Sequence, residues 1–311
     1  MMDIRFEDVS FGRDGRDVLV IPSLHIRADR STAILGPNGS GKTTLLRLIA
    51  ALERPSRGRV LVGGEVADTR RRSVSIAFQK EVFLRRSLLE NLVLGLTMRG
   101  SDRGEARDRA MQALRLLEID RLAGRRVDQI SGGEGRRASL ARALCLHAPV
   151  MLLDEPMAGL DGTTYSRLLD ALPGLVGHSG ATVVVVTHNA EEAFRLCDDI
   201  VIVVNGRVRT AGAKHHIATN PMFRDVAEVL GYTVLSAAGR LLAIPEGALR
   251  LATGPTQLSA IVDTVLHVVH EWDVIATIGA TRVHLGVPRS QVPPQSGHGI
   301  YLTARVMYDV S

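Results

Sequence analysis

The sequence predicts an α/β domain followed by a small all-β barrel, and three observations support this prediction. Short β-branched segments alternate with longer helical patterns up to about residue 212. A glycine-rich segment at residues 36–43 joins one predicted strand to one predicted helix. From about residue 230 the pattern changes to short alternating strands separated by Gly and Pro, with no strong helix. We therefore expect two domains, residues 1–230 and 231–311, with the boundary at 228–234.

The first domain begins with a hairpin pattern over residues 4–26, whose alternation breaks at the turn sequence GRDG. The segments that follow are continuously apolar, which predicts buried strands of a parallel sheet covered by helices. Strands are expected at 31–35, 74–78, 150–154, 182–187 and 199–204, and helices at 43–52, 105–119, 136–146 and 164–175.

The second domain is predicted to be a small antiparallel barrel of the OB-like kind. Its alternating segments at 260–269, 273–287 and 300–310 read as strands. The segment from residue 232 onward is formally neutral, so the net charge of +5 belongs to the first domain.

Composition excludes several classes of protein. Apolar content of 45% and charged content of 23% are ordinary for a soluble globular chain. Aromatic residues make up only 4%, too few for a base-stacking platform, and like charges form no long block, so we expect no nucleic-acid partner. Cys145 and Cys197 lie far apart in apolar contexts, which fits neither a disulfide framework nor a metal-ligand spacing.

No secretory signal pattern is present in the opening residues MMDIRFEDVS. The longest apolar runs have the length of strands, and none approaches the roughly 18 residues that a membrane-spanning helix needs. If the protein works at a membrane, other chains must supply the spanning helices.

The segment GPNGSGKT, residues 36–43, fits the pattern G-x-x-x-x-G-K-[ST]. Glycines let the backbone curl so that several N–H groups point at one phosphate, and the following helix directs its N-terminal dipole at the same anion. Lys42 would place a charge at the β and γ oxygens, and Thr43 a hydroxyl on Mg²⁺. The alternative is a glycine-rich turn. The residues expected to bind the nucleotide are Gly36, Pro37, Asn38, Gly39, Ser40, Gly41, Lys42, Thr43 and Thr44.

Two adjacent carboxylates, Asp154 and Glu155, follow the apolar segment PVMLL. An Asp at the tip of a buried strand can hold Mg²⁺ directly or through water, and the next Glu is placed to polarise an attacking water as a general base. The alternative for Asp154 is a helix N-cap. Hydrolysis of a nucleoside triphosphate needs both a phosphate cradle and an acid for the metal, so Lys42 favours the catalytic interpretation.

A second anion-binding helix start is predicted in ISGGEGRRASLARAL, residues 130–144, where Ser131 precedes Gly132 and Gly133. One chain seldom needs two phosphate cradles for one nucleotide. We therefore expect a homodimer in which this segment of each copy closes over the γ-phosphate bound to the other. The alternative is a capped helix after a loop.

These motifs, in this order, resemble the ATP-binding subunits of ABC transporters. The resemblance covers residues 3 to about 230 and implies a P-loop NTPase with a RecA-like core, an antiparallel β subdomain and a helical subdomain. It implies ATP and Mg²⁺ as cofactors, and ATP hydrolysis in a homodimeric sandwich at the cytoplasmic face of the membrane. Gly36–Thr43 is similar to the Walker A loop, and Asp154 and Glu155 to the Walker B acid and the catalytic base.

The same resemblance implies roles for residues outside these two motifs. Gln79 is similar to the Q-loop glutamine, which implies a catalytic and a metal contact. His188 is similar to the switch histidine that senses the γ-phosphate, with Asn189 where Asp is usual. Asp161 in AGLD is similar to the D-loop aspartate near the nucleotide.

Two further nucleotide contacts follow from the resemblance. Residues 131–134 are similar to the signature motif, with Glu134 where Gln is most common. Phe11 matches the aromatic residue that stacks on adenine, where Tyr is more usual. A phenyl ring keeps the π-face and loses only the hydroxyl. The alternative for Phe11 is a core residue of the hairpin.

Residues 80–100 correspond to the stretch that meets a short helix of the membrane subunit in this family. An apolar face flanked by Arg85 and Arg86 suits such docking, and the alternative is the core of the helical subdomain. This stretch is also similar to the subfamily that imports tungstate and related oxyanions. The apolar face is expected to contain Phe83, Leu84, Leu88, Leu89 and Leu92.

Residues 232–311 resemble the TOBE/MOP-like β-domain of importer ATPases for molybdate, sulfate, sugars and polyamines. In LAIPEGALRL, Ile244 replaces the usual Arg and Gly247 the usual Asp of the family's R-P-E-D segment. The domain would either bind the transported oxyanion and regulate transport, or only pair the two subunits.

The resemblance predicts an importer ATPase, for an oxyanion such as tungstate or molybdate, that works with two permease subunits and indirectly with a substrate-binding protein. The alternatives are an importer of sugar, polyamine or sulfate, a non-transport ABC ATPase acting on DNA or ribosomes, and an oxyanion sensor built on the barrel.

Overall fold

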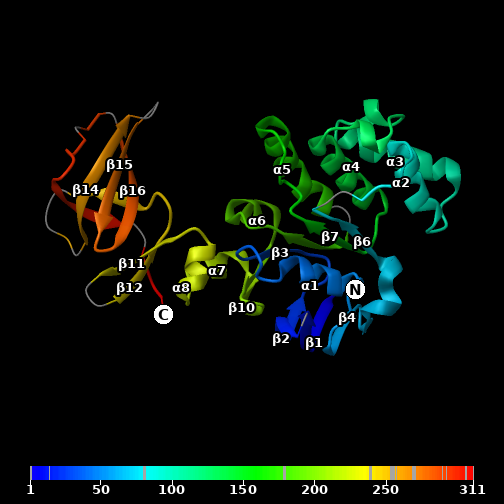
Figure 1. Cartoon of the computed structure of the whole chain (residues 1–311), viewed down its shortest axis with the longest axis horizontal. Helices are drawn as coiled ribbons and strands as arrows, with labels where there is room; N and C mark the ends of the chain where they lie inside the picture. The colour runs from blue at the N-terminus through cyan, green and yellow to red at the C-terminus, as the bar shows by residue number, and fades with distance from the viewer. Residues whose placement is uncertain are drawn as a thin grey trace. The chain divides into compact units, whose positions relative to one another are not determined.

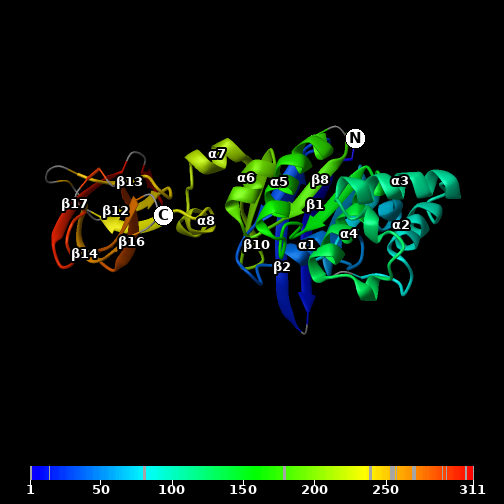
Figure 2. The ribbon, with the colours of Figure 1, turned by 90° about the horizontal axis from the view of Figure 1, so that it is seen from above.

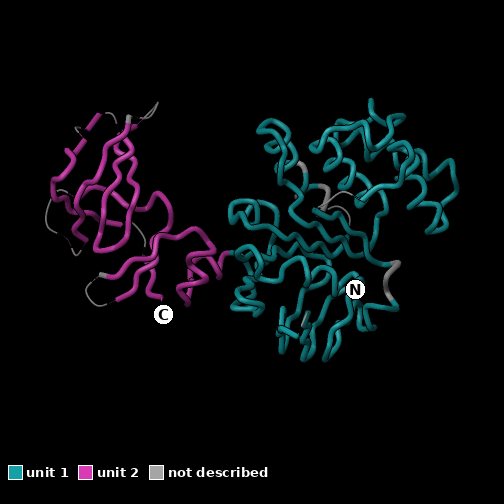
Figure 3. The backbone as a smooth tube through the Cα atoms, viewed as in Figure 1, with its two compact units in different colours: residues 1–214 teal, residues 215–311 magenta. Residues whose placement is uncertain are grey.

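The structure is a computed structural model that describes residues 2–13, 15–79, 82–177, 180–237, 240–252, 256, 258–267, 271–288, 290–291, 293–304 and 307–310. It divides into two compact units, Met1–Lys214 and His215–Ser311 (Figure 3). Helix α8 (Arg224–Val229) groups with the second unit because Ala227 packs against Ala243 and Val310. The domain boundary near residue 230, between the ATPase domain and the β-domain, therefore stays a prediction.

A six-stranded sheet forms the centre of the first unit, in the order β10-β9-β3-β8-β7-β6. The inner strands pair in parallel, as their continuous apolar character predicted, and β10 is an antiparallel edge strand that the sequence analysis missed. The strands are β3 (Ser31–Leu35), β6 (Val74–Ala77), β7 (Val150–Asp154), β8 (Thr182–Val186), β9 (Asp199–Val204) and β10 (Arg207–Ala213).

Helices cover both faces of this sheet (Figures 1 and 2). Helix α1 (Lys42–Ile49) lies between it and a second sheet, and α5 (Gly162–Gly177) and α6 (Ala190–Leu196) lie on the opposite face. The second sheet is antiparallel, in the order β2-β1-β4-β5. Its strands are β1 (Ile4–Arg13), β2 (Arg16–Ile26), β4 (Arg57–Val62) and β5 (Glu65–Val66), and the 3₁₀ segment η1 (Ala67–Ser73) follows.

A helical subdomain is inserted between β6 and β7. It contains α2 (Leu88–Thr97), α3 (Arg103–Leu116), the 3₁₀ turns η2 (Asp120–Leu122) and η3 (Val127–Gln129), and α4 (Gly132–Cys145). Its core consists of Leu and Ala side chains that recur at helical spacing along its helices. Among them are Leu92 and Ala110, both 0% exposed.

The second unit begins with α7 (Lys214–Thr219) and α8, and its strands form antiparallel, barrel-like sheets. The predicted strands at 273–287 and 300–310 are each two strands, the first of them interrupted by a turn at 279–280, and 268–269 of the predicted strand at 260–269 lie outside the described residues. One sheet contains β11 (Thr233–Ala237), β12 (Arg240–Ile244) and β18 (Tyr308–Asp309); the other contains β13 (Leu249–Leu251), β17 (Gly299–Ala304), β14 (Leu258–His267), β15 (Glu271–Ile278) and β16 (Thr281–Pro288). Among the described residues, no helix is both long enough and apolar enough to cross a membrane.

Candidate nucleotide site

The glycine-rich segment is a tight loop between β3 and α1, and close backbone approach explains two of its glycines. A Cβ at Gly36 would lie 2.0 Å from the carbonyl oxygen of Val203, and a Cβ at Gly41 would lie 2.5 Å from Cδ2 of Leu19. Gly41 also has φ 101°, a conformation that glycine adopts without strain, and it is the N-cap of α1. The loop therefore packs closely against its neighbours and ends at the N-terminus of α1, the positive end of that helix.

Lys42 closes this loop from inside. Its Nζ donates hydrogen bonds to the carbonyl oxygens of Gly36, at 2.7 Å, and Pro37, at 3.0 Å. The residue is only 7% exposed, and this burial lowers the pKa of the ammonium, although the nearby carboxylates of Glu155 and Asp154 oppose the shift. A buried ammonium beside open backbone amides is a site that an anion would complete.

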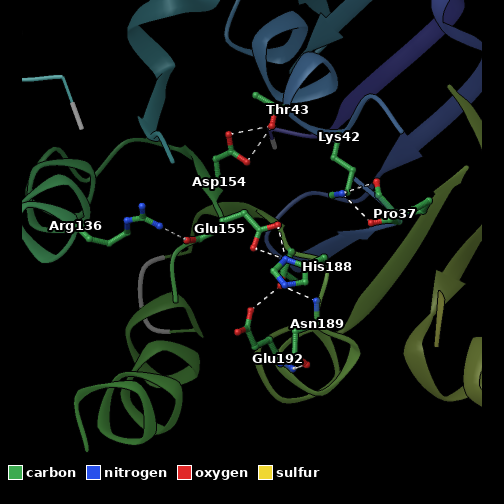
Figure 4. Close-up of polar contacts among 11 residues, drawn as sticks. Pro37, Lys42, Thr43, Arg136, Asp154, Glu155, His188, Asn189 and Glu192 are labelled. Atoms are coloured by element: carbon green, nitrogen blue, oxygen red, sulfur yellow. Dashed lines mark hydrogen bonds and ion pairs between the residues drawn. The ribbon is translucent and has the colours of Figure 1, made fainter. Parts of the chain in front are cut away.

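The side chains of Asp154 and Thr43 meet beside the loop. Asp154 is the last residue of β7, and Thr43 lies in the first turn of α1. The Thr43 hydroxyl donates to the Asp154 carboxylate at 3.2 and 3.3 Å (Figure 4). Asp154 is 3% exposed, and burial raises the pKa of its carboxyl because the charged form is desolvated. A hydroxyl and a buried carboxylate are hard oxygen ligands, so this pair fits Mg²⁺.

Glu155 and His188 form the other half of the site. Nδ1 of His188 lies 2.9 Å from each carboxylate oxygen of Glu155 (Figure 4). Glu155 has φ 51°, and its N–H donates to the carbonyl oxygen of Val186 on β8 at 2.9 Å. That strained bend directs the side chain away from the end of β7 toward the turn that carries His188. A general base is typically oriented by a third group, and His188 is such a partner for the Glu155 carboxylate.

A cavity of about 360 Å³ lies beside these groups. Its described lining contains Gln79, Glu155 and most of the predicted loop, together with Val18 and Val186, which were not predicted. The predicted loop, metal-binding and catalytic residues outside this lining are Gly36, Pro37, Ser40, Asp154 and His188. Val18 comes from β2, and no local motif marks it. Val186 ends β8 two residues before His188, which could have indicated it. The described lining is Val18, Asn38, Gly39, Gly41, Lys42, Thr43, Thr44, Gln79, Glu155 and Val186.

Residues 131–134 form a capped helix start outside this cavity lining. The hydroxyl of Ser131 accepts from the N–H of Glu134 at 3.4 Å, while the Glu134 carboxylate accepts from the N–H of Ser131 at 3.0 Å. Arg121 also donates to Glu134 at 2.8 Å, and the backbone hydrogen bond from Ser131 contributes most to the lowered pKa of Glu134. A Cβ at Gly132 would meet no described atom within 4 Å, so this helix end is open.

Asp161 and Phe11 also lie outside the described cavity lining. Asp161 caps α5 by accepting from the N–H of Thr164 at 3.0 Å and from its hydroxyl at 2.8 Å. Phe11 is 6% exposed and belongs to the hydrophobic core between the two sheets. In this structure the ring therefore has no free face for a base, and the stacking on adenine stays a prediction that requires the ring to turn outward.

The predicted docking face divides between core and surface. Leu88, Leu89 and Leu92 are 0%, 8% and 0% exposed, so their assignment to a docking surface was wrong: they form the helical core. Leu84 is 52% exposed, and Phe83 lies under the guanidinium of Arg142, 4.7 Å from the ring centre. Lys80 lies outside the described residues.

A strand–loop–helix phosphate site with carboxylates at the end of another parallel strand of the same sheet defines a P-loop nucleoside triphosphatase. A family model described as ABC transporter matches residues 20–158. The chain is 35% identical over 264 residues to the Fe(3+) ions import ATP-binding protein FbpC of Streptomyces avermitilis, which covers 83% of this chain and 76% of that protein.

Two further comparisons agree with this match. The chain is 35% identical over 210 residues to the tungstate uptake system ATP-binding protein TupC of Peptoclostridium acidaminophilum, covering 68% of this chain and 98% of that protein. A solved dimeric post-hydrolysis state of an ATP-binding cassette, bound to ADP and Pi, superposes with a TM-score of 0.62 at 29% identity, over 68% of this chain and 98% of that one. The chain belongs to the ABC transporter family, as an importer-type ATP-binding subunit.

Proposed function

We propose that two copies of this chain hydrolyse ATP in a sandwich that drives solute uptake through separate membrane subunits, at the cytoplasmic face of the membrane. The single observation that carries the proposal is the convergence of Lys42, Thr43, Gln79 and Glu155 on one cavity, with His188 against Glu155. Those side chains come from four different segments of the chain. The family match supports the same activity.

Each side chain has a distinct task in this proposal. The loop amides and Lys42 bind and orient the triphosphate, while Val18 offers an apolar contact to the nucleotide. Thr43 and Asp154 would hold Mg²⁺, which supplies neutralisation of the phosphate charge when bound. Glu155 accepts a proton from the attacking water, and His188 holds the carboxylate that does so.

The open helix start at Ser131–Glu134 supports the dimer. Its capping box fixes the first turn of α4, and Gly132 in that turn is exposed and carries no side chain. We infer that the N-terminal amides of α4 complete the site of the second copy, close to Asp161. Light scattering of the Glu155→Gln variant with MgATP tests this: a nucleotide-dependent dimer is expected, and Gly132→Asp, which places a carboxylate at this anion-binding end, should abolish it. A variant that dimerised equally well would contradict this role.

We propose that the permease docks near residues 82–86, where exposed Val82 and Leu84 are flanked by Arg85 and Arg86. Leu84→Asp should reduce co-purification with membrane subunits from the native host. Leu116→Asp is the matched control, because Leu116 is also exposed, at 45%, but lies on α3. Equal capture of both variants would remove this surface from the proposal. Capture of nucleic acid in place of membrane subunits would favour the non-transport alternative.

We propose an oxyanion such as tungstate or molybdate as the solute, supported by the relative named for tungstate uptake, nearly all of which this chain matches. The relative named for Fe(3+) import supports the alternative of another solute. Elemental analysis of a deletion strain decides between them: lost tungsten or molybdenum uptake, restored by the gene, is expected. Unchanged oxyanion uptake with lost iron uptake would refute the oxyanion assignment.

The predicted C-terminal domain, residues 231–311, would either regulate transport or only pair the two subunits. Calorimetric titration of the full chain with molybdate, tungstate and sulfate separates the two roles. Binding heat would support regulation, and no heat for all three anions would leave pairing.

A further inference from the structure

Glu192 is a buried carboxyl beside the catalytic pair that the proposed function does not use. It lies in the first turn of α6 and is 7% exposed. The hydroxyl of Thr187, which is 0% exposed at the end of β8, donates to Glu192 Oε2 at 2.6 Å. Burial raises the pKa of this carboxyl, and the nearby Glu155 acts in the same direction.

The turn that carries His188 is tied to Glu192 on both sides, by the carboxyl through Thr187 and by the main-chain N–H through Asn189 (Figure 4). Thr187 Oγ1 accepts from the N–H of Asn189 at 3.0 Å, so one hydroxyl joins Glu192 to the residue after His188. The side chain of Asn189 in turn accepts from the N–H of Glu192 at 3.3 Å. Residues 187, 189 and 192 therefore form a closed set of hydrogen bonds around His188.

A second contact extends this set to α5. Burial and, after it, the nearby carboxylate of Glu192 raise the pKa of Tyr165 to about 12, so these two side chains lie close together. The N–H of Tyr165 donates to the carbonyl oxygen of Asp161 at 2.8 Å. Glu192 thus joins the first turn of α5, directly after Asp161, to the turn that carries His188.

His188 needs this support because packing does not hold it. Its side chain is 62% exposed, and its described contact is the Glu155 carboxylate at 2.9 Å. The direction of the imidazole therefore depends on the main chain of the turn. A side chain that is displaced by a fraction of an ångström can lose much of its catalytic effect.

We propose that Glu192 is a positioning residue for ATP hydrolysis, which through Thr187 and Asn189 holds His188 against Glu155. The inference rests on the proposed function, because it assigns Glu192 to that same site. Glu192 itself makes no contact with the nucleotide in this role. Its loss should therefore change the rate of hydrolysis and not the binding of ATP.

The test is steady-state hydrolysis together with MgATP binding for the wild type and three variants. Glu192→Ala should lower kcat by about 10- to 100-fold with KM and ATP affinity within about twofold. Glu192→Gln retains an acceptor for Thr187 and should restore most of the rate. Glu191→Ala is the matched control, because Glu191 is the exposed neighbour on the same helix, with its side chain 70% exposed.

A double-mutant cycle supplies the decisive readout, since residues that act through one another are not additive. His188→Ala combined with Glu192→Ala should be no slower than His188→Ala alone. Multiplied losses, or equal losses of rate and ATP affinity in Glu192→Ala, would overturn the inference while the ATPase assignment stands. An inactive wild-type protein would instead refute the proposed function, and the inference with it.

Discussion

Replacement of Glu155 by Gln isolates the proton-accepting step from everything else in the site. Gln is nearly isosteric, its N–H can still donate to Val186, and its amide oxygen can still face Nδ1 of His188. Lys42 and the loop are unchanged. The variant therefore loses the negative charge and the ability to accept a proton, and little else.

The expected magnitude follows from that difference. A positioned general base contributes about 10²- to 10⁴-fold, so kcat should fall by that factor, equivalent to about 2.7–5.5 kcal/mol of transition-state stabilisation. ATP affinity should stay equal or increase, because Glu155 lines the same cavity as the phosphate loop and the substitution removes a negative charge from it.

Phosphate release under saturating MgATP measures the rate, and equilibrium binding of a fluorescent ATP analogue measures the affinity. Glu191→Gln, an exposed position on α6, controls for the loss of one carboxylate. Turnover at the wild-type rate would refute the assignment of Glu155 as the base. A parallel loss of ATP binding would show that the substitution disturbs the loop, and would refute the reasoning from isosteric geometry.

Three further predictions concern the phosphate loop and the metal ligands. Lys42→Ala should weaken ATP binding by about 10- to 100-fold, since charge-assisted hydrogen bonds contribute about 1.5–3 kcal/mol; unchanged affinity in a titration would contradict the cradle. Asp154→Asn should abolish Mg²⁺-dependent hydrolysis yet raise the melting temperature at neutral pH. Because the pKa of Asp154 is raised in the folded state, its ionisation destabilises the fold as pH rises through that pKa. The gain in melting temperature from Asp154→Asn should therefore shrink as pH falls toward the pKa of an unfolded Asp. A gain that did not change with pH would contradict this explanation. Gly36→Ala should destabilise the fold by about 1–3 kcal/mol in urea, because its Cβ meets the backbone of Val203, and by more than Gly39→Ala, whose Cβ meets nothing within 4 Å; equal losses would point to backbone strain alone.

The strands of the central sheet were predictable because their apolar residues are continuous. β3, β7 and β9 have the predicted bounds, since each is buried along nearly its whole length. Helix α4 begins at Gly132, as predicted from the helix start at Ser131, whereas the apolar pattern alone placed the helix at 136–146; the Ser131–Glu134 capping box makes the glycines part of its first turn. Edge strand β10 was missed because it is only half-buried and carries no long apolar run.

The docking face shows where periodic patterns become ambiguous. Leu84 and Leu88 are four residues apart in the same apolar stretch, yet one is 52% exposed and the other 0%. Helix α2 begins after Ser87, so Leu84 precedes the helix, whereas Leu88 is its first residue and is buried. An apolar pattern indicates that a face will be buried. It does not indicate whether that face packs against the rest of this chain or against a partner protein.

The sequence by itself determined the phosphate loop, the central strands and the identity of the acid and base candidates, because these depend on local backbone conformation and on residue order. Tertiary structure alone decided which of those groups meet. β7 lies beside β8 with Asp154 paired to Val186, and this register brings Glu155 to His188, Val186 to the cavity, and the turn before Glu192 into the site. Strand order and register arise from packing summed over the whole sheet, so they are not encoded in any one segment.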